Sequence, residues 1–540
     1  MSSKSKNIGQ WMVVSLGLPV VVFPQANAVG EPVNNLSNSR PNIIFIFADD
    51  WGFGDLGVHG HKGLKTPHLD KMASEGIDFH QFYVCSPVSS SSRTALITGQ
   101  FPSRHLVHEH FAAPELNESR GMPNWLNPAV VTLPKLLKQS GYKTAHFGKW
   151  HLSSDGKAGT PLPVEYGYHE SRVYNGAGPQ VERGPAEYPT AIFTENSVNY
   201  TQDFIRANKN SPFFVNLWIH ETHQPIEPSP EMRIPYKDVP EPQQSYYSVV
   251  SSADKHLGRL FQFLKDEGLD DNTLVVFSSD NGPEHNNAPT TWNSVGETAG
   301  LKARKRSLYN GGVKVPFIVR FPGVVPAGKV DSTTVLAAVD ILPTLCDVAG
   351  VNLPEGYVSD GEKITDALIG KTFKRNKPIF QYWQGSAAGL NWPRLSVIDG
   401  KYKLLMTYDK SRIELYDHLN DWGEMVNLAE KEPSEVARLS EMCYSYYHSL
   451  PLTKHIIPGV TLISAAEASD VIIYSSGDRL HVHTPAECAL SVFRVDGKHA
   501  GHYILSMGYS SFALSAGFYI IRYELEKRVY YKKIQISQPM

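Results

Sequence analysis

Residues 41–54 of the 540-residue chain read PNIIFIFADDWGFG, and this stretch decides the fold. Residues 42–48 form a continuous apolar run, as in a strand that is buried on both faces of a mostly parallel sheet. Asp49 and Asp50 follow at its carboxyl end, which is where open α/β sheets build their sites. The stretch therefore predicts a central strand that carries two carboxylates to a functional edge.

The same pattern continues outward along the chain. Helices are predicted from Thr66-Pro67 and from Thr132, where a threonine can cap the helix and a proline fits the first turn. A long amphipathic helix is predicted over residues 245–269. Further buried strands are predicted at residues 213–219, 273–279 and 316–321. The alternation predicts the α/β fold class, with a large doubly wound, mostly parallel sheet over about residues 40–350.

Two smaller units are predicted after this sheet. Residues 375–455 contain two short strands and a helix from Glu432, which indicates a small α+β subdomain. Residues 460–540 alternate apolar and polar residues in short runs, as in a β-sandwich-like module. This module weakly resembles sorting or attachment modules of exported bacterial proteins, and an accessory, stabilising domain is the alternative. The predicted boundaries are 1–28 for a signal peptide, 29–374 for the α/β domain, 375–455 for the subdomain and 460–540 for the module.

The overall charge gives no reason to expect a nucleic-acid partner. Fifty-one basic residues stand against 54 acidic ones, for a net charge of -3, so there is no general basic field. The four cysteines show no C-x-x-C spacing, which argues against a thiolate metal site and leaves room for at most an incidental disulfide. Any anion must therefore be bound locally.

The first 28 residues have the order of a signal peptide. Lys4 and Lys6 precede an apolar run from Trp11 to Phe23, and Ala26-Asn27-Ala28 offers a cleavage site near Ala28. A membrane anchor is the alternative, but the run is shorter than the roughly 20 residues that span a bilayer. We therefore expect a bacterial periplasmic, secreted or cell-surface protein without an integral membrane segment after cleavage.

Two acidic pairs follow predicted strands. Asp49-Asp50 alone is compatible with capping or with a solvated loop, but Asp280-Asn281 stands at the end of the strand predicted at 273–279. Adjacent carboxylates repel each other unless a cation lies between them, and oxygen ligands suit Ca²⁺ or Mg²⁺. The two pairs together predict an all-oxygen metal site.

Hydroxyl and basic residues cluster in other segments. Residues 85–99 read CSPVSSSSRTALITG, in which a helix-like segment places backbone N–H groups and Arg93 around Ser89 as an anion pocket. Lysines and histidines at strand ends can bind a tetrahedral anion and move protons, although each taken singly is more often a surface or core residue. The candidates are Lys149, His151, His220, His223 and Lys305.

As a set, these segments resemble the type I sulfatases of the alkaline phosphatase superfamily, in order over about residues 40–450. The matching segments are 41–54, 89–99, HFGKWH at 146–151, THQP at 222–225, SSDNG at 278–282 and KARKRSLYNGG at 302–312. The resemblance implies a sulfuric ester hydrolase whose nucleophile is formylglycine (3-oxoalanine), made from a Cys or Ser in the pattern C/S-x-P-x-R.

Two registers of that pattern compete in this sequence. Cys85 with Pro87 lacks the arginine, and Ser89 with Arg93 has Ser91 in place of the proline. In the family a Thr-Gly pair begins five residues after the arginine, and Thr98-Gly99 stands at that distance from Arg93, so the resemblance assigns the modified residue to Ser89. A serine-type motif implies transient contact with an oxygen-independent, radical sulfatase-maturing enzyme.

The resemblance also implies roles for the other residues. One divalent cation, with Ca²⁺ favoured over Mg²⁺, is expected on Asp49, Asp50, Ser89, Asp280 and Asn281. Arg93 and Lys149 are expected to orient the nucleophile, and His151 to take its proton. The substrate is expected to contact Lys149, His220, His223 and Lys305, with His223 as the general acid.

Predicted export and the segment 220–223, which is similar to hexosamine 6-sulfatases, favour a sulfated carbohydrate as substrate. We therefore predict an exo-acting glycan sulfatase, of which a 6-O-sulfatase is one form. The alternatives are an arylsulfatase, a phosphate or phosphonate ester hydrolase with unmodified Ser89, and a glycan-binding pseudoenzyme. Residues that select the sugar are expected in the loops 104–127 and 155–190 and near Trp383, Trp392 and Arg394.

Overall fold

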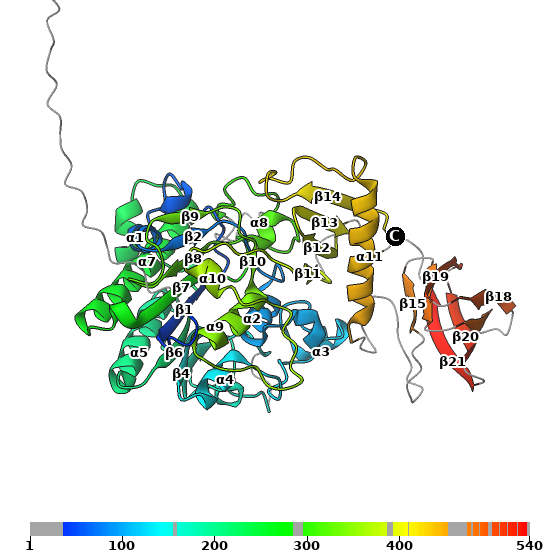
Figure 1. Ribbon diagram of the computed structural model, residues 1–540, viewed down its shortest axis with the longest axis horizontal. Helices are drawn as coiled ribbons and strands as arrows, with labels where there is room; N and C mark the ends of the chain where they lie inside the picture. Colours follow the sequence, from blue (N-terminus) through cyan, green and yellow to red (C-terminus); the bar gives the residue numbers. More distant parts are fainter. Residues whose placement is uncertain are drawn as a thin grey trace, which may run out of the picture.

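The structure is a computed structural model, and every structural statement below concerns the residues that it describes. These are residues 36–154, 159–284, 295–385, 392–408, 410–451, 472–476, 479–484, 487–494, 499–506, 508–515, 517–525 and 528–536. The predicted signal peptide lies outside them. Figure 1 shows an α/β body, a smaller unit that ends in a long helix, and a separate group of C-terminal strands.

An eight-stranded sheet forms the centre of the body, in the spatial order β5-β4-β6-β1-β7-β8-β2-β9. Its strands are β1 (Asn42–Ala48), β2 (Ile77–Phe79), β4 (Lys143–Lys149), β5 (Glu170–Tyr174), β6 (Phe213–Trp218), β7 (Thr273–Ser279), β8 (Phe317–Arg320) and β9 (Lys329–Asp331). The strands β4, β6, β1 and β7 are parallel neighbours, whereas β8 runs antiparallel to both β7 and β2. The predicted α/β fold class is confirmed, and the reversed direction of β8 is a feature that its apolar run did not indicate.

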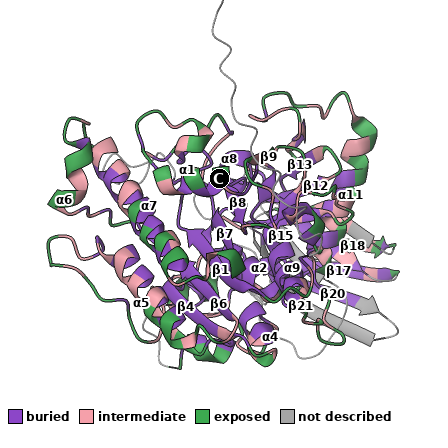
Figure 2. Cartoon of the chain, turned by 60° about the vertical axis from the view of Figure 1, so that its left-hand side comes forward, coloured by how far each residue is buried: buried purple, intermediate pink, exposed green. Residues whose placement is uncertain are grey.

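Helices cover both faces of this sheet, as a doubly wound fold requires, and the strands lie buried between them (Figure 2). Alternate residues of β1 point to opposite faces. Phe45 belongs to the core beneath α2 (Ser89–Thr98), α4 (Leu133–Gln139) and α9 (Ile341–Val348). Ile44 belongs to the core beneath α1 (Pro67–Ser74), α5 (Phe193–Asn208) and α7 (Gln243–Asp266). A strand buried on both sides has no polar face, which explains the continuous apolar run in the sequence.

The smaller unit is a four-stranded antiparallel sheet with one helix. It contains β11 (Ile379–Tyr382), β12 (Leu395–Asp399), β13 (Tyr402–Met406), β14 (Ile413–Asp417) and α11 (Pro433–Ser449). Leu404 and Leu439 belong to the same hydrophobic cluster as Phe45 of β1. This unit therefore shares a continuous core with the large sheet.

The C-terminal strands form two antiparallel sheets of their own. One contains β15 (Ile472–Ser476), β16 (Arg479–Thr484) and β19 (Gly508–Ala513), and the other β17 (Cys488–Arg494), β18 (His499–Leu505), β20 (Gly517–Leu525) and β21 (Arg528–Ile536). Leu480, Val492 and Ile521 belong to a hydrophobic cluster that is separate from the main core. The predicted β-sandwich-like module is present, while its function remains a prediction.

The described chain also contains several short strands and α-helices. They are β3 (Phe82–Tyr83), β10 (Leu336–Ala337), α3 (Pro114–Ser119), α6 (Pro230–Arg233), α8 (Asn310–Val313) and α10 (Thr365–Leu368). Among the described residues, no helix combines the length and the apolar character that crossing a bilayer requires. All four cysteines are buried, and none of them takes part in a disulfide bond.

Candidate active site

The predicted site residues meet because four parallel strands end at one edge of the sheet. Lys149 is the last residue of β4, and His220 lies just beyond β6. Asp49 follows β1, and Asp280 follows β7, whose Ser279 is in register with Ala48. The Asp280 N–H donates to the Ala48 carbonyl at 3.0 Å, so the two acidic pairs lie side by side. Segments that are far apart in the sequence therefore converge at the carboxyl edge that the pattern predicted.

Oxygen atoms of the two acidic pairs gather around Ser89. Carboxylate oxygens of Asp49, Asp50 and Asp280 lie within 4.8 Å of one another. Ser89 is the first residue of α2, and its Oγ lies 3.3 Å from Asp49 Oδ1 and 3.4 Å from Asn281 Oδ1. All five side chains are buried. The five residues predicted as metal ligands thus share one centre.

This donor set fits a hard divalent cation. Every donor is oxygen, which suits Ca²⁺ or Mg²⁺ rather than a metal that prefers nitrogen or sulfur. Burial raises the pKa of Asp50 to about 7, although the charge of Lys305 acts to lower it. The nearby carboxylates of Asp49 and Asp280 also raise this pKa. Three buried carboxylates this close repel one another, and a cation between them would remove that cost.

Three basic side chains surround the carboxylates. The Lys149 Nζ donates to Asp49 Oδ2 at 2.6 Å and lies 3.4 Å from Ser89 Oγ. The Arg93 guanidinium donates to Asp280 Oδ2 at 3.1 and 2.6 Å, and Lys305 donates to Asp50 Oδ2 at 2.6 Å. Burial tends to raise the pKa of Asp49, but the charge of Lys149, with the hydrogen bond from His220 and the charge of Arg93, holds it well below its usual range. The three carboxylates are therefore fixed in place by ion pairs, and Lys149 also contacts the Ser89 hydroxyl.

The histidines at this edge occupy different positions. His220 Nδ1 lies 2.9 Å from Asp49 Oδ2, and His220 is almost fully buried. The neighbouring Thr222 hydroxyl donates to the Asp49 carbonyl. His223 is partly exposed, with its ring 5.1 Å from that of His220. His220, predicted to contact substrate, is thus placed behind Asp49, whereas His223 faces outward.

His151 has a defined tautomer. Its Nε2 lies 3.0 Å from the Phe111 carbonyl oxygen, which can only accept a hydrogen bond, so Nε2 carries the proton. Its Nδ1 is therefore unprotonated and carries a lone pair. This buried nitrogen has no hydrogen-bond partner among the described residues. Burial, together with the charge of Lys149, holds the pKa of His151 well below its usual value. This neutral imidazole can accept a proton.

A cavity of about 590 Å³ opens over Ser89. Its lining consists of Val88, Ser89, His110, Phe111, Ala112, Ala113, Pro114, His151, Asn175, His223, Lys305 and Arg306. Ser89, His151, His223 and Lys305 therefore reach the cavity, while Arg93, Lys149 and His220 are not part of its lining. The loops predicted to select the ligand contribute His110 and Asn175.

Some residues of the site were not identified from the sequence. Glu284 lies 3.3 Å from the Lys305 Nζ and also pairs with Arg306, so it offsets part of the positive charge of these two residues. Glu109 is buried, and its Oε1 accepts hydrogen bonds from the His110 Nδ1 at 2.8 Å and from the His110 N–H at 3.0 Å. Its Oε2 accepts from the Trp383 Nε1 at 2.9 Å. Glu109 and His110 lie in the loop 104–127, and this position was the only sequence signal for them.

Comparisons with known proteins agree with this geometry. Residues 41–351 match the family model described as Sulfatase. Residues 302–443 match the model described as N-sulphoglucosamine sulphohydrolase, C-terminal. Together, the matched ranges extend over the large sheet and most of the smaller unit.

Individual proteins are similar over most of their length. The N-acetylgalactosamine-6-sulfatase of Canis lupus familiaris is 31% identical over 77% of this chain and 80% of its own length. The N-acetylgalactosamine-6-O-sulfatase of Bacteroides thetaiotaomicron is 26% identical over 82% of this chain and 99% of its own. The protein in the crystal structure of Ps i-CgsB in complex with k-i-k-neocarrahexaose is 26% identical in sequence to this chain. The two structures match with a TM-score of 0.65 over 75% of this chain and 92% of that one.

Proposed function

The chain belongs to the sulfatase family, and from that premise we propose that it removes O-sulfate groups from a carbohydrate, with Ser89 at the position of the nucleophile. The observation that carries the proposal is the convergence of Ser89, three carboxylates and three basic side chains, of which Ser89 and Lys305 line one cavity. The carbohydrate substrate is supported by the names of the similar proteins, which include two N-acetylgalactosamine-6-sulfatases and a protein crystallised with an oligosaccharide.

The proposed site combines a cation and a modified serine. Asp49, Asp50, Asp280, Asn281 and residue 89 would hold one Ca²⁺ or Mg²⁺ ion, which supplies positive charge beside the nucleophile. We propose that Ser89 is oxidised to formylglycine, because an ordinary serine would end the first step as a stable sulfate ester. The hydrated aldehyde offers a second hydroxyl group, through which sulfate can be released.

The chain's own side chains would do the rest. Lys305 lines the cavity and can neutralise the sulfate group, and Lys149 and Arg93 hold the nucleophile and its carboxylate neighbours from behind. His151, with its free Nδ1 lone pair, would accept the proton whose removal completes sulfate release. Each positioned donor in such a site typically contributes about 10²- to 10³-fold in rate.

We assign protonation of the leaving alcohol to His223. Its Nδ1 lies 3.0 Å from the Gln224 carbonyl oxygen, so that nitrogen carries a proton and leaves Nε2 for the ligand. The partial burial of the ring and the charges of Lys149 and Lys305 lower the pKa of His223, which favours its neutral form in the free protein. The negative charge of a bound sulfate ester acts in the opposite direction, and we propose that His223 takes up its second proton with the substrate.

The His223→Gln variant should lose activity in a way that depends on the leaving group. On a carbohydrate sulfate, whose alkoxide is a poor leaving group, we expect a fall in kcat of about 10²- to 10⁴-fold. On 4-nitrophenyl sulfate, whose phenolate leaves without protonation, the fall should be much smaller. The measurement is kcat on both substrates, with His68→Gln as a remote control. An equal loss on both substrates would contradict the assignment.

The Glu109→Gln variant should weaken recognition of the sugar. The carboxylate accepts from both His110 and Trp383, and a glutamine amide can accept from only one side, so one of these two bonds is lost. We expect kcat/KM for a carbohydrate sulfate to fall about tenfold, the equivalent of about one hydrogen bond, and inhibition by free sulfate to stay the same. Steady-state kinetics with a sugar sulfate and an aryl sulfate make the comparison. If both substrates lost activity equally, His110 would not contact the sugar.

The decisive test of the proposed function is sulfate release from a panel of defined sulfated monosaccharides and disaccharides. The protein is produced together with a radical sulfatase-maturing enzyme, and the peptide that contains Ser89 is weighed by mass spectrometry. We expect loss of two hydrogens at Ser89 and release from one sulfate position, with the 6-O-sulfated hexosamines as the first candidates. An unchanged Ser89 with turnover of phosphate esters would favour the phosphatase alternative. Binding of the modified protein to sulfated sugars without turnover would favour the pseudoenzyme.

A further inference from the structure

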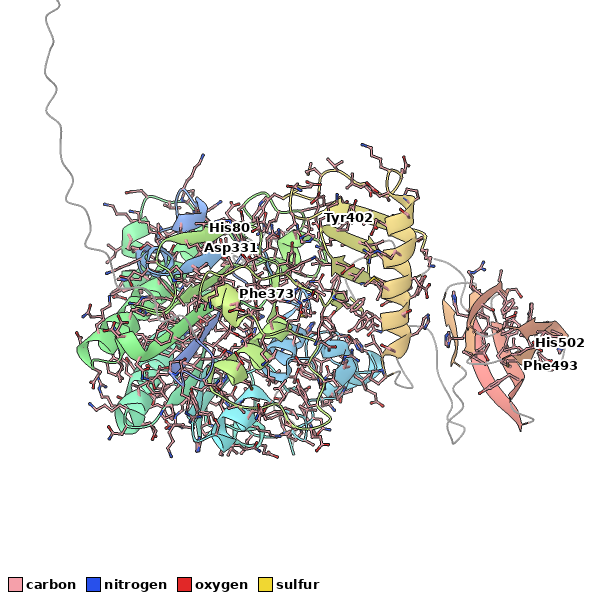
Figure 3. All side chains as sticks on the ribbon, in the orientation of Figure 1. His80, Asp331, Phe373, Tyr402, Phe493 and His502 are labelled. Carbon is pink, nitrogen blue, oxygen red and sulfur yellow. The ribbon has the colours of Figure 1, made fainter. Side chains whose placement is uncertain are left out.

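A second group of potential metal ligands is made by residues that the proposed sulfatase site does not use. It consists of His59, the last residue of a short 3-10 helix (Gly57–His59), Asp78 in β2, and His80 just after β2. One ligand atom from each residue lies within 4.8 Å of the others. Figure 3 shows His80 beside Asp331 of β9, and the His80 N–H donates to the Asp331 carbonyl at 2.8 Å. We propose that His59, Asp78 and His80 bind a divalent transition-metal ion of the Zn²⁺ class.

The orientation of His59 is that of a metal ligand. Its Nδ1 lies 2.6 Å from the Phe53 carbonyl oxygen, which can only accept, so Nδ1 carries the proton. The opposite nitrogen, Nε2, points at Asp78 Oδ2 from 2.8 Å. A histidine bound to metal typically donates its other N–H to a carbonyl in this way, which fixes the tautomer and the ring. The Phe53 ring stacks on the imidazole at 4.0 Å and holds its plane.

Asp78 has an unexplained buried oxygen. The residue is 1% exposed, and its Oδ2 contacts both His59, at 2.8 Å, and His80, at 3.3 Å. Its Oδ1 is buried and has no hydrogen-bond partner among the described residues. Leaving a carboxylate oxygen unpaired in the interior costs free energy. If His59 were protonated, hydrogen bonds from the two histidines would account for Oδ2, but Oδ1 would still have no partner. A cation, in contrast, can be bound by both oxygens of the carboxylate.

The chemistry of the three donors selects the type of metal. Two imidazole nitrogens and one carboxylate suit Zn²⁺ and its first-row neighbours, while Ca²⁺ and Mg²⁺ prefer oxygen. The His80 side chain is 25% exposed, so it gives an ion access and leaves room for water as the fourth ligand. The proposed cation site around Ser89 offers only oxygen ligands, so its metal preference is the opposite. The two centres would therefore take different metals from the same medium.

The bound ion would join two parts of the fold. His59 ends the segment that starts at Asp50, whereas Asp78 lies in β2 and His80 directly follows it, beside the edge strand β9 of the large sheet. The Trp422 ring also packs in this region, at 4.9 Å from the Phe53 ring. A metal at this point would stabilise the segment that follows the catalytic carboxylates, and we assign it a structural rather than a catalytic role.

The test uses the full-length, untagged protein saturated with Ca²⁺, to which Co²⁺ is added as a spectroscopic probe for the Zn²⁺ class. We expect visible d–d bands that saturate at one equivalent, disappear on addition of Zn²⁺, and are absent from the His80→Ala variant. His169→Ala, a change of an exposed histidine elsewhere, should leave them intact. Zn²⁺ should raise the Tm of the wild type and leave that of His80→Ala unchanged.

Asp78→Asn provides a second, nearly isosteric variant, and it should also lose the bands. The proposal is overturned if the wild type shows no saturable Co²⁺ spectrum, or if the spectrum persists in both variants, which would place the ion on other histidines. These readouts do not involve sulfate release, so they can fail while the proposed sulfatase activity holds, and the reverse is equally possible.

Discussion

Co-matured Ser89→Ala protein should release sulfate at least about 10⁴-fold more slowly than the wild type, because a lost nucleophile leaves only binding and charge stabilisation. Ser89 Oγ is the hydroxyl that lies between Asp49, Asn281 and Lys149, and alanine removes both the reacting group and one ligand of the cation site. Cys85→Ala should retain most of the wild-type rate. Cys85 is fully buried in the hydrophobic core and does not line the cavity.

This pair of variants decides between the two registers of the motif. The measurement is kcat on a sulfated sugar, with mass spectrometry of the 85–99 peptide to establish which side chain has been oxidised. Ser92→Ala is a matched control, because the Ser92 hydroxyl is buried in the same helix and has no hydrogen-bond partner among the described residues. Loss of activity in Cys85→Ala with a modified cysteine would show that the other register is used.

Removal of the cation should have the next largest effect. Asp50→Asn is expected to lower kcat by about 10³-fold, comparable to the loss of a positioned charge in other active sites. The change removes one carboxylate ligand and leaves Lys305 with Glu284 as its acidic partner. In the wild type, a chelator should abolish sulfate release, and added Ca²⁺ or Mg²⁺ should restore it.

The cation dependence should also vary with pH. Because burial raises the pKa of Asp50 to about 7, a proton competes with the cation for this carboxylate below that pH. The Ca²⁺ concentration needed for half-maximal activity should therefore be higher at pH 6 than at pH 8. In Asp50→Asn this particular dependence should disappear.

The control for Asp50→Asn is Asp360→Asn, which replaces a carboxylate that binds Arg104 outside the cavity. It should leave both the rate and its cation dependence close to those of the wild type. Full activity after exhaustive chelation, with no metal retained by elemental analysis, would contradict the proposed cation site.

Local sequence patterns predicted the central strand and the carboxylates at its end. The continuous apolar run at 42–48 is typical of a strand buried on both faces, and Asp49 and Asp50 follow it directly. The resemblance to the sulfatase family, through the distance from Arg93 to Thr98, favoured Ser89 over Cys85, and the structure places Ser89 in the cavity and Cys85 in the core. These features are readable because they depend on residues that are neighbours in the chain.

The neighbours of these side chains became known from the folded chain alone. It placed His220 behind Asp49, joined Glu109 to His110 and Trp383, set β8 antiparallel, and brought His59 beside Asp78 and His80. Local patterns specify which face of a strand is buried, but they do not specify the order and direction of strands within a sheet. Contacts between residues on different strands and loops follow from that order, and so the neighbours of each functional side chain could be identified only once the chain was folded.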